Sequence, residues 1–257
     1  MPGNLLGERF IVVSFGESHG RCVGSVIDGC PAGLPLGEGD IQKDLDLRRP
    51  GVSTTATKRS EKDKVELLSG VFEGYTTGAP ICALIWNKDV DSEPYKKIKK
   101  IPRPGHADIT AFWKYGGYND WRGGGRFSGR VTATFVIAGA IAKKLISYIL
   151  GIDVFAYSIE IGGIRAKEVS DDVAKKFRYS NEVRCPDFEA AKKMKSKILE
   201  EQSKGDSVGG IIECKVLNVP VGLGEPVFSS LESDLSKALF SIPAVKGIEF
   251  GVGFEVC

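Results

Sequence analysis

The sequence predicts an α+β fold, and two observations lead to that class. Strand-like runs of β-branched and aromatic residues and helix-like segments follow one another without the strict alternation of a doubly wound sheet. No convincing linker, repeat or low-complexity tract interrupts the 257 residues. We therefore expect a single domain over residues 1–257. An apolar content of 42% and a charged content of 26% agree with a globular protein.

The first half of the chain contains predicted strands, one short helix and a long loop. Residues 10–15 (FIVVSF) are compact, β-branched and aromatic, and they end at Gly16, which predicts a strand. Asp40 is the expected N-cap of a short helix through Leu47, which Pro50 stops. The remaining elements expected here are strands at 65–72 and 81–86 and a surface loop at 88–105.

The second half contains the longest predicted helix. Ser128 is its expected N-cap, and it ends before Gly151. Its middle, VTATFVIAGAIA, is apolar or small on every face, which is typical of a helix buried all round. The other expected elements are strands at 153–161, 211–219 and 245–250 and helices at 186–204 and 231–241.

Charge and composition exclude several function classes. The net charge of +2 gives no global field toward nucleic acid or membrane, so we expect neither as a partner. The longest uncharged run of the most apolar region, residues 131–142, is too short to span a bilayer. The N-terminal segment MPGNLLGERF lacks signal-peptide features, which predicts a cytoplasmic protein. Six cysteines without a CxxC pair and only two histidines predict no metal site.

Each of the two histidines lies in a glycine-bearing turn. His19 follows a predicted strand in GESHG and can exchange a proton near neutral pH. His106 lies in RPGHAD beside Arg103, a fixed cation suited to phosphate or carboxylate, with Asp108 as the expected cap of the next helix. The alternatives are a histidine satisfied by backbone hydrogen bonds and a capped loop with a solvated arginine.

Two further segments are rich in arginine. In residues 121–130 (WRGGGRFSGR), three consecutive glycines and three arginines lead into a helix N-terminus. An anion site and a flexible capped loop are about equally consistent with this pattern. Arg48 and Arg49 end the first helix, where cations also simply complement the helix dipole. Together these segments indicate a site for a small polyanion that carries phosphate and carboxylates, with two histidines available for proton transfer.

Eight segments, in this order, resemble the chorismate synthase family: GESHG, DLDLRRPG, LLSGVFEGYTTGAPI, RPGHAD, KYG with RGGGR, AGAIAKK, GLGEPVF and IPAVKGIEFGVGF. The resemblance covers nearly the whole chain. It implies a lyase of the shikimate pathway of aromatic amino acid biosynthesis, which converts 5-enolpyruvylshikimate 3-phosphate to chorismate by 1,4-elimination of phosphate. It further implies reduced FMN as cofactor, NADPH as a candidate reductant, a homotetramer, and a β-α-β sandwich with helices between antiparallel sheets.

The resemblance also assigns roles to residues. His19 resembles the acid that protonates the departing phosphate, and His106 resembles the histidine beside the flavin. Substrate contacts are implied for Ser18, Arg48, Arg49, Arg103 and Arg130. FMN contacts are implied for Arg126, Phe127, Ser128, Pro243 and Ala244. Arg48 alternatively matches a contact to NADPH.

The sequence departs from the family pattern at several positions. Phe127 stands where a serine is common, Val131 where a glutamate is common, and Thr54 where an arginine is frequent. The family pattern continues beyond Cys257, so the resemblance implies an N-terminal, C-terminally incomplete domain. Two other readings stay open: a non-catalytic anion-binding remnant and a flavin-dependent oxidoreductase. The absence of a dinucleotide fingerprint argues against the second.

Overall fold

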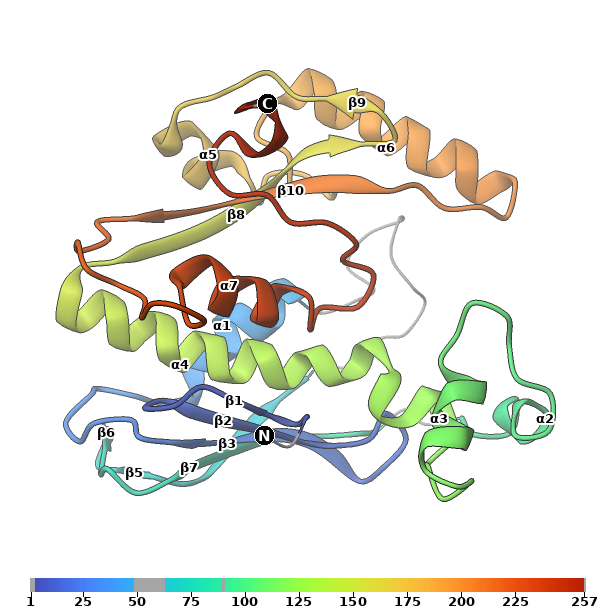
Figure 1. Ribbon diagram of the computed structural model, residues 1–257, viewed down its shortest axis with the longest axis horizontal. Coiled ribbons are helices and arrows are strands. Elements are labelled where there is room, and N and C mark those ends of the chain that lie inside the picture. Colours follow the sequence, from blue (N-terminus) through green and yellow to red (C-terminus); the bar gives the residue numbers. More distant parts are fainter. Residues whose placement is uncertain (1–2, 49–62, 89–90, 257) are drawn as a thin grey trace. The chain divides into compact units, whose positions relative to one another are not determined.

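A computed structural model describes residues 3–48, 63–88 and 91–256 (Figure 1). Contacts divide them into two compact units. The first unit comprises the described residues up to 142 together with residues 220–256, and the second comprises residues 143–219. The single domain over residues 1–257 stays a prediction.

The centre of the first unit is a five-stranded antiparallel sheet of order β1-β2-β3-β7-β4. The strands are β1 (Leu5–Leu6), β2 (Ile11–Gly16), β3 (Cys22–Asp28), β4 (Val65–Ser69) and β7 (Ile81–Trp86). A two-stranded ribbon joins β5 (Val71–Phe72) to β6 (Tyr75–Thr76). The predicted strands at 10–15 and 81–86 are confirmed, whereas residues 65–72 form two strands because Gly70 turns the chain at a φ of +81°.

Strand β3 has no counterpart among the predicted elements. Gly24 and Ser25 interrupt its β-branched run, which hides the strand pattern. In the sheet, a Cβ on Gly24 would lie 2.5 Å from the tip of the Phe15 ring. The glycine therefore makes room for a side chain of the neighbouring strand.

Helix α1 (Glu38–Arg48) begins two residues before the expected cap Asp40. The Asp40 carboxylate instead reaches back and accepts a hydrogen bond from the backbone N–H of Gly37 at 3.0 Å, the reciprocal half of a capping box. Ile41 and Leu45 are fully buried, as their spacing on one helix face predicts.

Helix α4 (Thr132–Leu150) follows the 3₁₀ turn η2 (Gly129–Val131), and Ser128 caps that turn by accepting from the N–H of Arg130. Thr134 fixes the helix to the sheet: its hydroxyl lies 2.7 Å from that of Ser14, and its carbonyl accepts from Ser25 at 2.7 Å. The expectation that the middle of this helix is buried on all faces is wrong, because Gly139 is exposed and Phe135 and Val136 are only half-buried. By length and composition alone, residues 129–150 could cross a membrane, a test that core helices also pass.

The remaining elements of the first unit are α2 (Tyr95–Ile98), α3 (Asp108–Lys114), η1 (Arg122–Phe127), α7 (Leu231–Leu239) and η3 (Gly253–Val256). Two expectations are corrected here. Residues 88–105 contain the short helix α2 and are not a continuous loop. Residues 245–250 form no strand, because their backbone pairs with no other strand of the described chain.

The second unit is a three-stranded antiparallel sheet of order β10-β8-β9 with two helices. Its elements are β8 (Asp153–Ile161), β9 (Ile164–Arg165), α5 (Asp171–Phe177), α6 (Phe188–Ser203) and β10 (Gly210–Leu217). The predicted strand at 153–161 is confirmed at both ends. Apolar residues of α6, Met194 among them, pack with Ile161 and Ile164 of the sheet. Helices thus accompany antiparallel sheets in both units, as the α+β class predicts.

Candidate active site

The turn that carries His19 connects β2 to β3 in the first unit. Gly16 starts it at a φ of +90°, where a Cβ would lie 2.1 Å from the carbonyl oxygen of Cys22. Ser18, which is almost fully buried, donates its backbone N–H to the carbonyl of Gly125 at 3.3 Å. This bond joins the turn to the glycine-rich segment more than 100 residues later in the chain.

Two side chains, one just before helix α2 and one at its first residue, hold the imidazole of His19. Its Nδ1 lies 2.9 Å from the hydroxyl of Ser92, and its ring meets the ring of Tyr95 edge to face at 5.1 Å between centroids. The sequence alone left open a histidine satisfied by backbone groups, and the structure places a side-chain hydroxyl at its Nδ1. If the Ser92 hydroxyl accepts, the proton of the neutral imidazole is on Nδ1, and if it donates, the proton is on Nε2.

A segment of three consecutive glycines lies against the ring of this histidine. Gly123, Gly124 and Gly125 have φ angles of +57°, +81° and +54°, which L side chains rarely adopt. A Cβ on Gly123 would lie 2.2 Å from Cδ2 and 2.4 Å from Nε2 of His19. Glycine is therefore needed here both for the backbone conformation and for the close approach of the loop to the imidazole.

Arg126, at the end of this loop, donates its hydrogen bonds to neutral oxygen atoms. Its Nη1 donates to the carbonyl of Gly16 at 2.8 Å, and its Nη2 donates to Oδ1 of Asn4 at 2.7 Å and to the carbonyl and hydroxyl of Ser14, each at 3.2 Å. Burial lowers the pKa of this guanidinium. Among the residues that the structure describes, no carboxylate pairs with it, so it adds positive charge at the base of the His19 turn.

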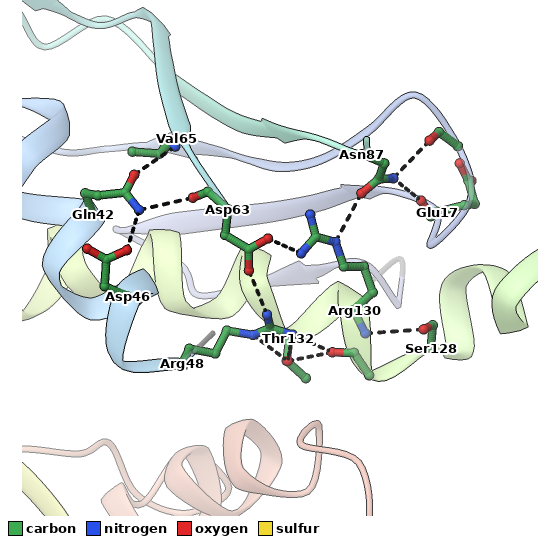
Figure 2. A network of polar contacts seen from close by, with 12 residues as sticks. Glu17, Gln42, Asp46, Arg48, Asp63, Val65, Asn87, Ser128, Arg130 and Thr132 are labelled. Atoms are coloured by element: carbon green, nitrogen blue, oxygen red, sulfur yellow. Dashed lines mark hydrogen bonds and ion pairs between the residues drawn. The ribbon is translucent and has the colours of Figure 1, made fainter. Parts of the chain in front are cut away.

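A buried carboxylate joins the two other arginines of the site (Figure 2). Oδ1 of Asp63 pairs with Nη1 of Arg130, and Oδ2 pairs with Nη1 of Arg48 at 3.2 Å. The Asp63 side chain is 0% exposed, that of Arg130 is 3% exposed, and that of Arg48 is 19% exposed. Arg48 also donates to Oγ1 of Thr132 and, at 3.0 Å, to the carbonyl of Gly129. The end of α1 is thereby attached to the start of α4.

Asn87 connects this arginine pair to the His19 turn. Its Oδ1 accepts from Nε of Arg130 at 3.1 Å. Its Nδ2 donates to the carbonyls of Glu17 and Gly20, at 3.0 and 2.9 Å. One amide thus binds both the turn that presents the histidine and the cation expected to bind substrate.

Arg103 is engaged by its own neighbour. Its Nε and Nη2 donate to the two carboxylate oxygens of Asp108 at 2.9 and 3.0 Å, and its guanidinium lies over the Tyr95 ring at 5.6 Å. The Arg103 hydrogen bonds lower the pKa of Asp108. The N-cap of α3 is Ala107, without a side-chain bond, so the expected capping role of Asp108 is wrong. The Tyr95 ring contacts both His19 and Arg103, so only this one ring separates the two residues.

The other predicted site residues are less closely connected. His106 is exposed, and its N–H bonds to the carbonyl of Arg103 at 3.4 Å. Phe127 is exposed, with its ring 6.4 Å from that of Tyr115, and Ser128 caps η2. Pro243 and Ala244 lie in an exposed turn after α7. Arg49 and Thr54 lie outside the described residues.

Four residues of this site have no counterpart in the sequence prediction: Asp63, Asn87, Ser92 and Tyr95. Asn87 directly follows β7, and a polar residue at a strand end is a signal that could have found it. Asp63 stands in a run of charged residues before β4, where nothing distinguishes it. Within the described part of the chain, no cluster of three or more His, Cys, Asp or Glu residues could hold a metal ion.

Comparisons with known proteins agree on one family. The family model described as chorismate synthase matches residues 10–257. A curated chorismate synthase of Korarchaeum cryptofilum (strain OPF8) is 55% identical over 255 residues, which cover 99% of this chain and 70% of the relative. One from Dehalococcoides mccartyi (strain ATCC BAA-2100 / JCM 16839 / KCTC 5957 / BAV1) is 55% identical over 251 residues, covering 98% and 69%.

A solved structure gives the same answer for the fold. The structure titled "Crystal Structure of Chorismate Synthase" matches with a TM-score of 0.77 at 32% identity, over 95% of this chain and 70% of that chain. The chain therefore spans about 70% of the length of the proteins it matches.

Proposed function

The chain belongs to the chorismate synthase family, and we propose that it converts 5-enolpyruvylshikimate 3-phosphate to chorismate and phosphate. The reaction is a 1,4-elimination in which a carbon–oxygen bond and a carbon–hydrogen bond break, phosphate and a proton depart, and a new carbon–carbon double bond forms. The proposed setting is the shikimate pathway of aromatic amino acid biosynthesis, in the cytoplasm.

The observation that carries this proposal is the arginine cluster around one histidine. The first unit contains Arg48, Arg126 and Arg130 within the network of contacts that includes the His19 turn. The substrate has one phosphate and two carboxylates, so its recognition requires concentrated positive charge. A protein of net charge +2 supplies that charge only by such local clustering.

His19 is the proposed general acid. Phosphate leaves more readily when a proton is delivered to it, and imidazole is the side chain best suited to do so near neutral pH. The hydroxyl of Ser92 at Nδ1 supports this role, because it holds the ring so that Nε2 faces the glycine-rich segment. Ser18, Arg48, Arg103 and Arg130 are the proposed substrate contacts.

The described residues fit an anionic flavin. Arg126 retains a cationic charge with neutral oxygen partners, and the neighbouring glycines expose backbone to close approach. Arg126, Phe127, Ser128, Pro243 and Ala244 are the residues proposed to hold FMN, His106 is proposed to act beside the flavin, and Arg48 is a proposed contact for NADPH. When bound, reduced FMN would supply electron density for the elimination without net oxidation or reduction.

The assembly proposed from family membership is a homotetramer, with a small phosphorylated carboxylate as substrate and no nucleic-acid or membrane partner. Sedimentation of the purified protein tests the tetramer directly.

The decisive experiment is phosphate release from 5-enolpyruvylshikimate 3-phosphate under anaerobic conditions with reduced FMN. We expect stoichiometric chorismate and phosphate, with the flavin reduced at the end. Net flavin oxidation that matches product would favour the oxidoreductase reading. Binding of substrate without turnover would favour the non-catalytic reading, and either result would overturn the proposal.

A further inference from the structure

We propose that Asp63 is a positioning residue, which orients the guanidiniums of Arg48 and Arg130 for the anionic groups of the substrate. The inference rests on the proposed function for the identity of that substrate. No sequence motif points to Asp63, and its role follows only from its contacts.

The carboxylate of Asp63 is divided between the two arginines. One oxygen pairs with Arg130 and the other with Arg48 (Figure 2). Two cations and one anion leave a net charge of +1 on the three side chains. The Asp63 carboxylate therefore holds two mutually repelling cations close together, and its one negative charge is smaller than their two positive charges. That is the arrangement needed to bind a multiply charged anion.

The backbone at Asp63 is itself fixed in position. Its φ of +43° is a strained value for a residue other than glycine, which neighbouring contacts must maintain. Gln42 of α1 donates Nε2 to the carbonyl of Asp63 at 3.2 Å and accepts from the N–H of Val65 at 3.0 Å. The same amide donates to Asp46 at 3.0 Å. Gln42 thus attaches the backbone at Asp63 and at the first residue of β4 to helix α1, which fixes the position from which the carboxylate extends.

The partners of Asp63 come from the ends of two helices. Arg48 is the last residue of α1, and Arg130 lies in η2 at the start of α4. Arginine side chains are long and flexible, and a fixed carboxylate removes much of that freedom before substrate arrives. With Nε of Arg130 bound to Asn87, that guanidinium is fixed from two directions. Asp63 accordingly acts on substrate through the arginines.

The test compares Asp63→Asn, Asp63→Glu, Arg130→Lys and the double variant Asp63→Asn/Arg130→Lys with the parent. KM and kcat come from anaerobic phosphate release, the substrate Kd from calorimetry, and stability from thermal melting. Asp153→Asn is the matched control, because it removes a carboxylate paired with Lys175 at 2.8 Å in the second unit.

For Asp63→Asn we expect KM and Kd to rise about 10- to 100-fold, the effect of losing a hydrogen bond between charged groups. Asp153→Asn should leave both constants unchanged. Because Asp63 acts through Arg130, the double variant should bind little worse than Arg130→Lys alone. If Asp63 had only a structural role, Asp63→Asn would lower the melting temperature and the active fraction but leave KM and Kd at their parental values. The effects of Asp63→Asn and Arg130→Lys on the free energy of substrate binding would then be additive.

Asp63→Asn removes the charge of a buried carboxylate that pairs with both guanidiniums, which destabilises the fold. Asp63→Glu keeps the charge and moves the carboxylate by one methylene, so it tests position even where Asp63→Asn does not fold. If Asp63→Glu or folded Asp63→Asn has the Kd and KM of the parent, the inference about Asp63 is wrong. The proposed function still stands in that case if the parent is active. If the parent binds substrate without turnover, the function fails and the Kd series still tests Asp63. If the parent binds none, both fail.

Discussion

Asn87 Oδ1 accepts a hydrogen bond from Nε of Arg130 at 3.1 Å. The two residues are 43 positions apart, one just after a strand and the other just before the longest helix. The same amide holds both ends of the turn around His19. A displacement of Asn87 therefore disturbs the proposed proton donor and a proposed anion contact together.

Asn87→Leu should lower both turnover and stability. It leaves two carbonyls and Nε of Arg130 without their partner, which costs about 1–3 kcal/mol in the free energy of unfolding. Turnover should fall roughly 100-fold, because small misplacement of reacting groups is costly. Denaturation and phosphate release measure the two effects.

Asn181→Leu is the control for Asn87→Leu, since Asn181 bonds both backbone groups of Cys185 in the second unit. It should lose stability but keep the kcat of the folded fraction. Equal kcat in the two variants would mean that Asn87 has only a structural role.

His19→Ala and His106→Ala should separate proton transfer from flavin effects. Removal of a general acid lowers turnover by about two to four orders of magnitude, so His19→Ala should show that loss with little change in substrate Kd. His106→Ala should alter the absorption spectrum of bound flavin, which His19→Ala should leave unchanged. Near-parental turnover in His19→Ala would remove His19 from the mechanism.

The Arg103–Asp108 pair should make stability depend on pH below the ordinary pKa of an aspartate, about 4. Hydrogen bonds from Arg103 lower the pKa of Asp108, so the folded state binds fewer protons than the unfolded state as pH falls. The stabilisation is complete above the unfolded pKa and is lost as pH falls through the lower, folded pKa.

The parent should therefore exceed Asp108→Asn in free energy of unfolding near neutral pH, and the difference should shrink in acid. Urea denaturation at a series of pH values measures it. In an Arg103→Leu background, the difference should lose most of its pH dependence. A difference that is constant from neutral pH into acid would contradict the assignment.

Local pattern explains why some of this molecule is predictable from its sequence. The strand at 81–86 matches because it is an uninterrupted apolar run, and the strand at 153–161 matches because β-branched and aromatic residues make up most of it. His19, Arg126 and Arg130 lie in glycine-rich segments, and such segments next to ionisable side chains predict a binding or catalytic site. Strand β3 was missed because Gly24, which accommodates Phe15, weakens its local pattern.

Tertiary pairing explains what the sequence does not reveal. Asp63 meets Arg130 across 67 positions, and no local pattern specifies that partnership. Asp108 looks like a helix cap because an acid before a helix usually is one, yet Arg103 provides a charged and bidentate partner. Where a side chain has two chemically reasonable partners, as Asp108 does, the sequence does not specify which one it contacts, because that depends on the tertiary structure.

Gly123→Ala should disable the site more than Gly124→Ala, although both positions have positive φ. A Cβ on Gly123 would lie 2.2 Å from Cδ2 of His19 and 2.9 Å from Oγ of Ser18, so the imidazole must move. At Gly124 the nearest atom would be Cβ of Ser128 at 3.8 Å, an ordinary contact. Alanine at either position carries the backbone strain of a left-handed conformation, about 1 kcal/mol or more.

Gly124→Ala is therefore the control for strain, and any additional loss in Gly123→Ala comes from the contact with His19. We expect Gly123→Ala to melt at a lower temperature than Gly124→Ala because of this added contact, and its folded fraction to have at least a 10-fold lower kcat in the phosphate-release assay. The pH profile of the residual activity should also shift in Gly123→Ala, because the displaced imidazole loses its hydrogen bond to Ser92. Equal kcat and equal pH profiles would show that the close approach of this glycine to His19 has no part in catalysis.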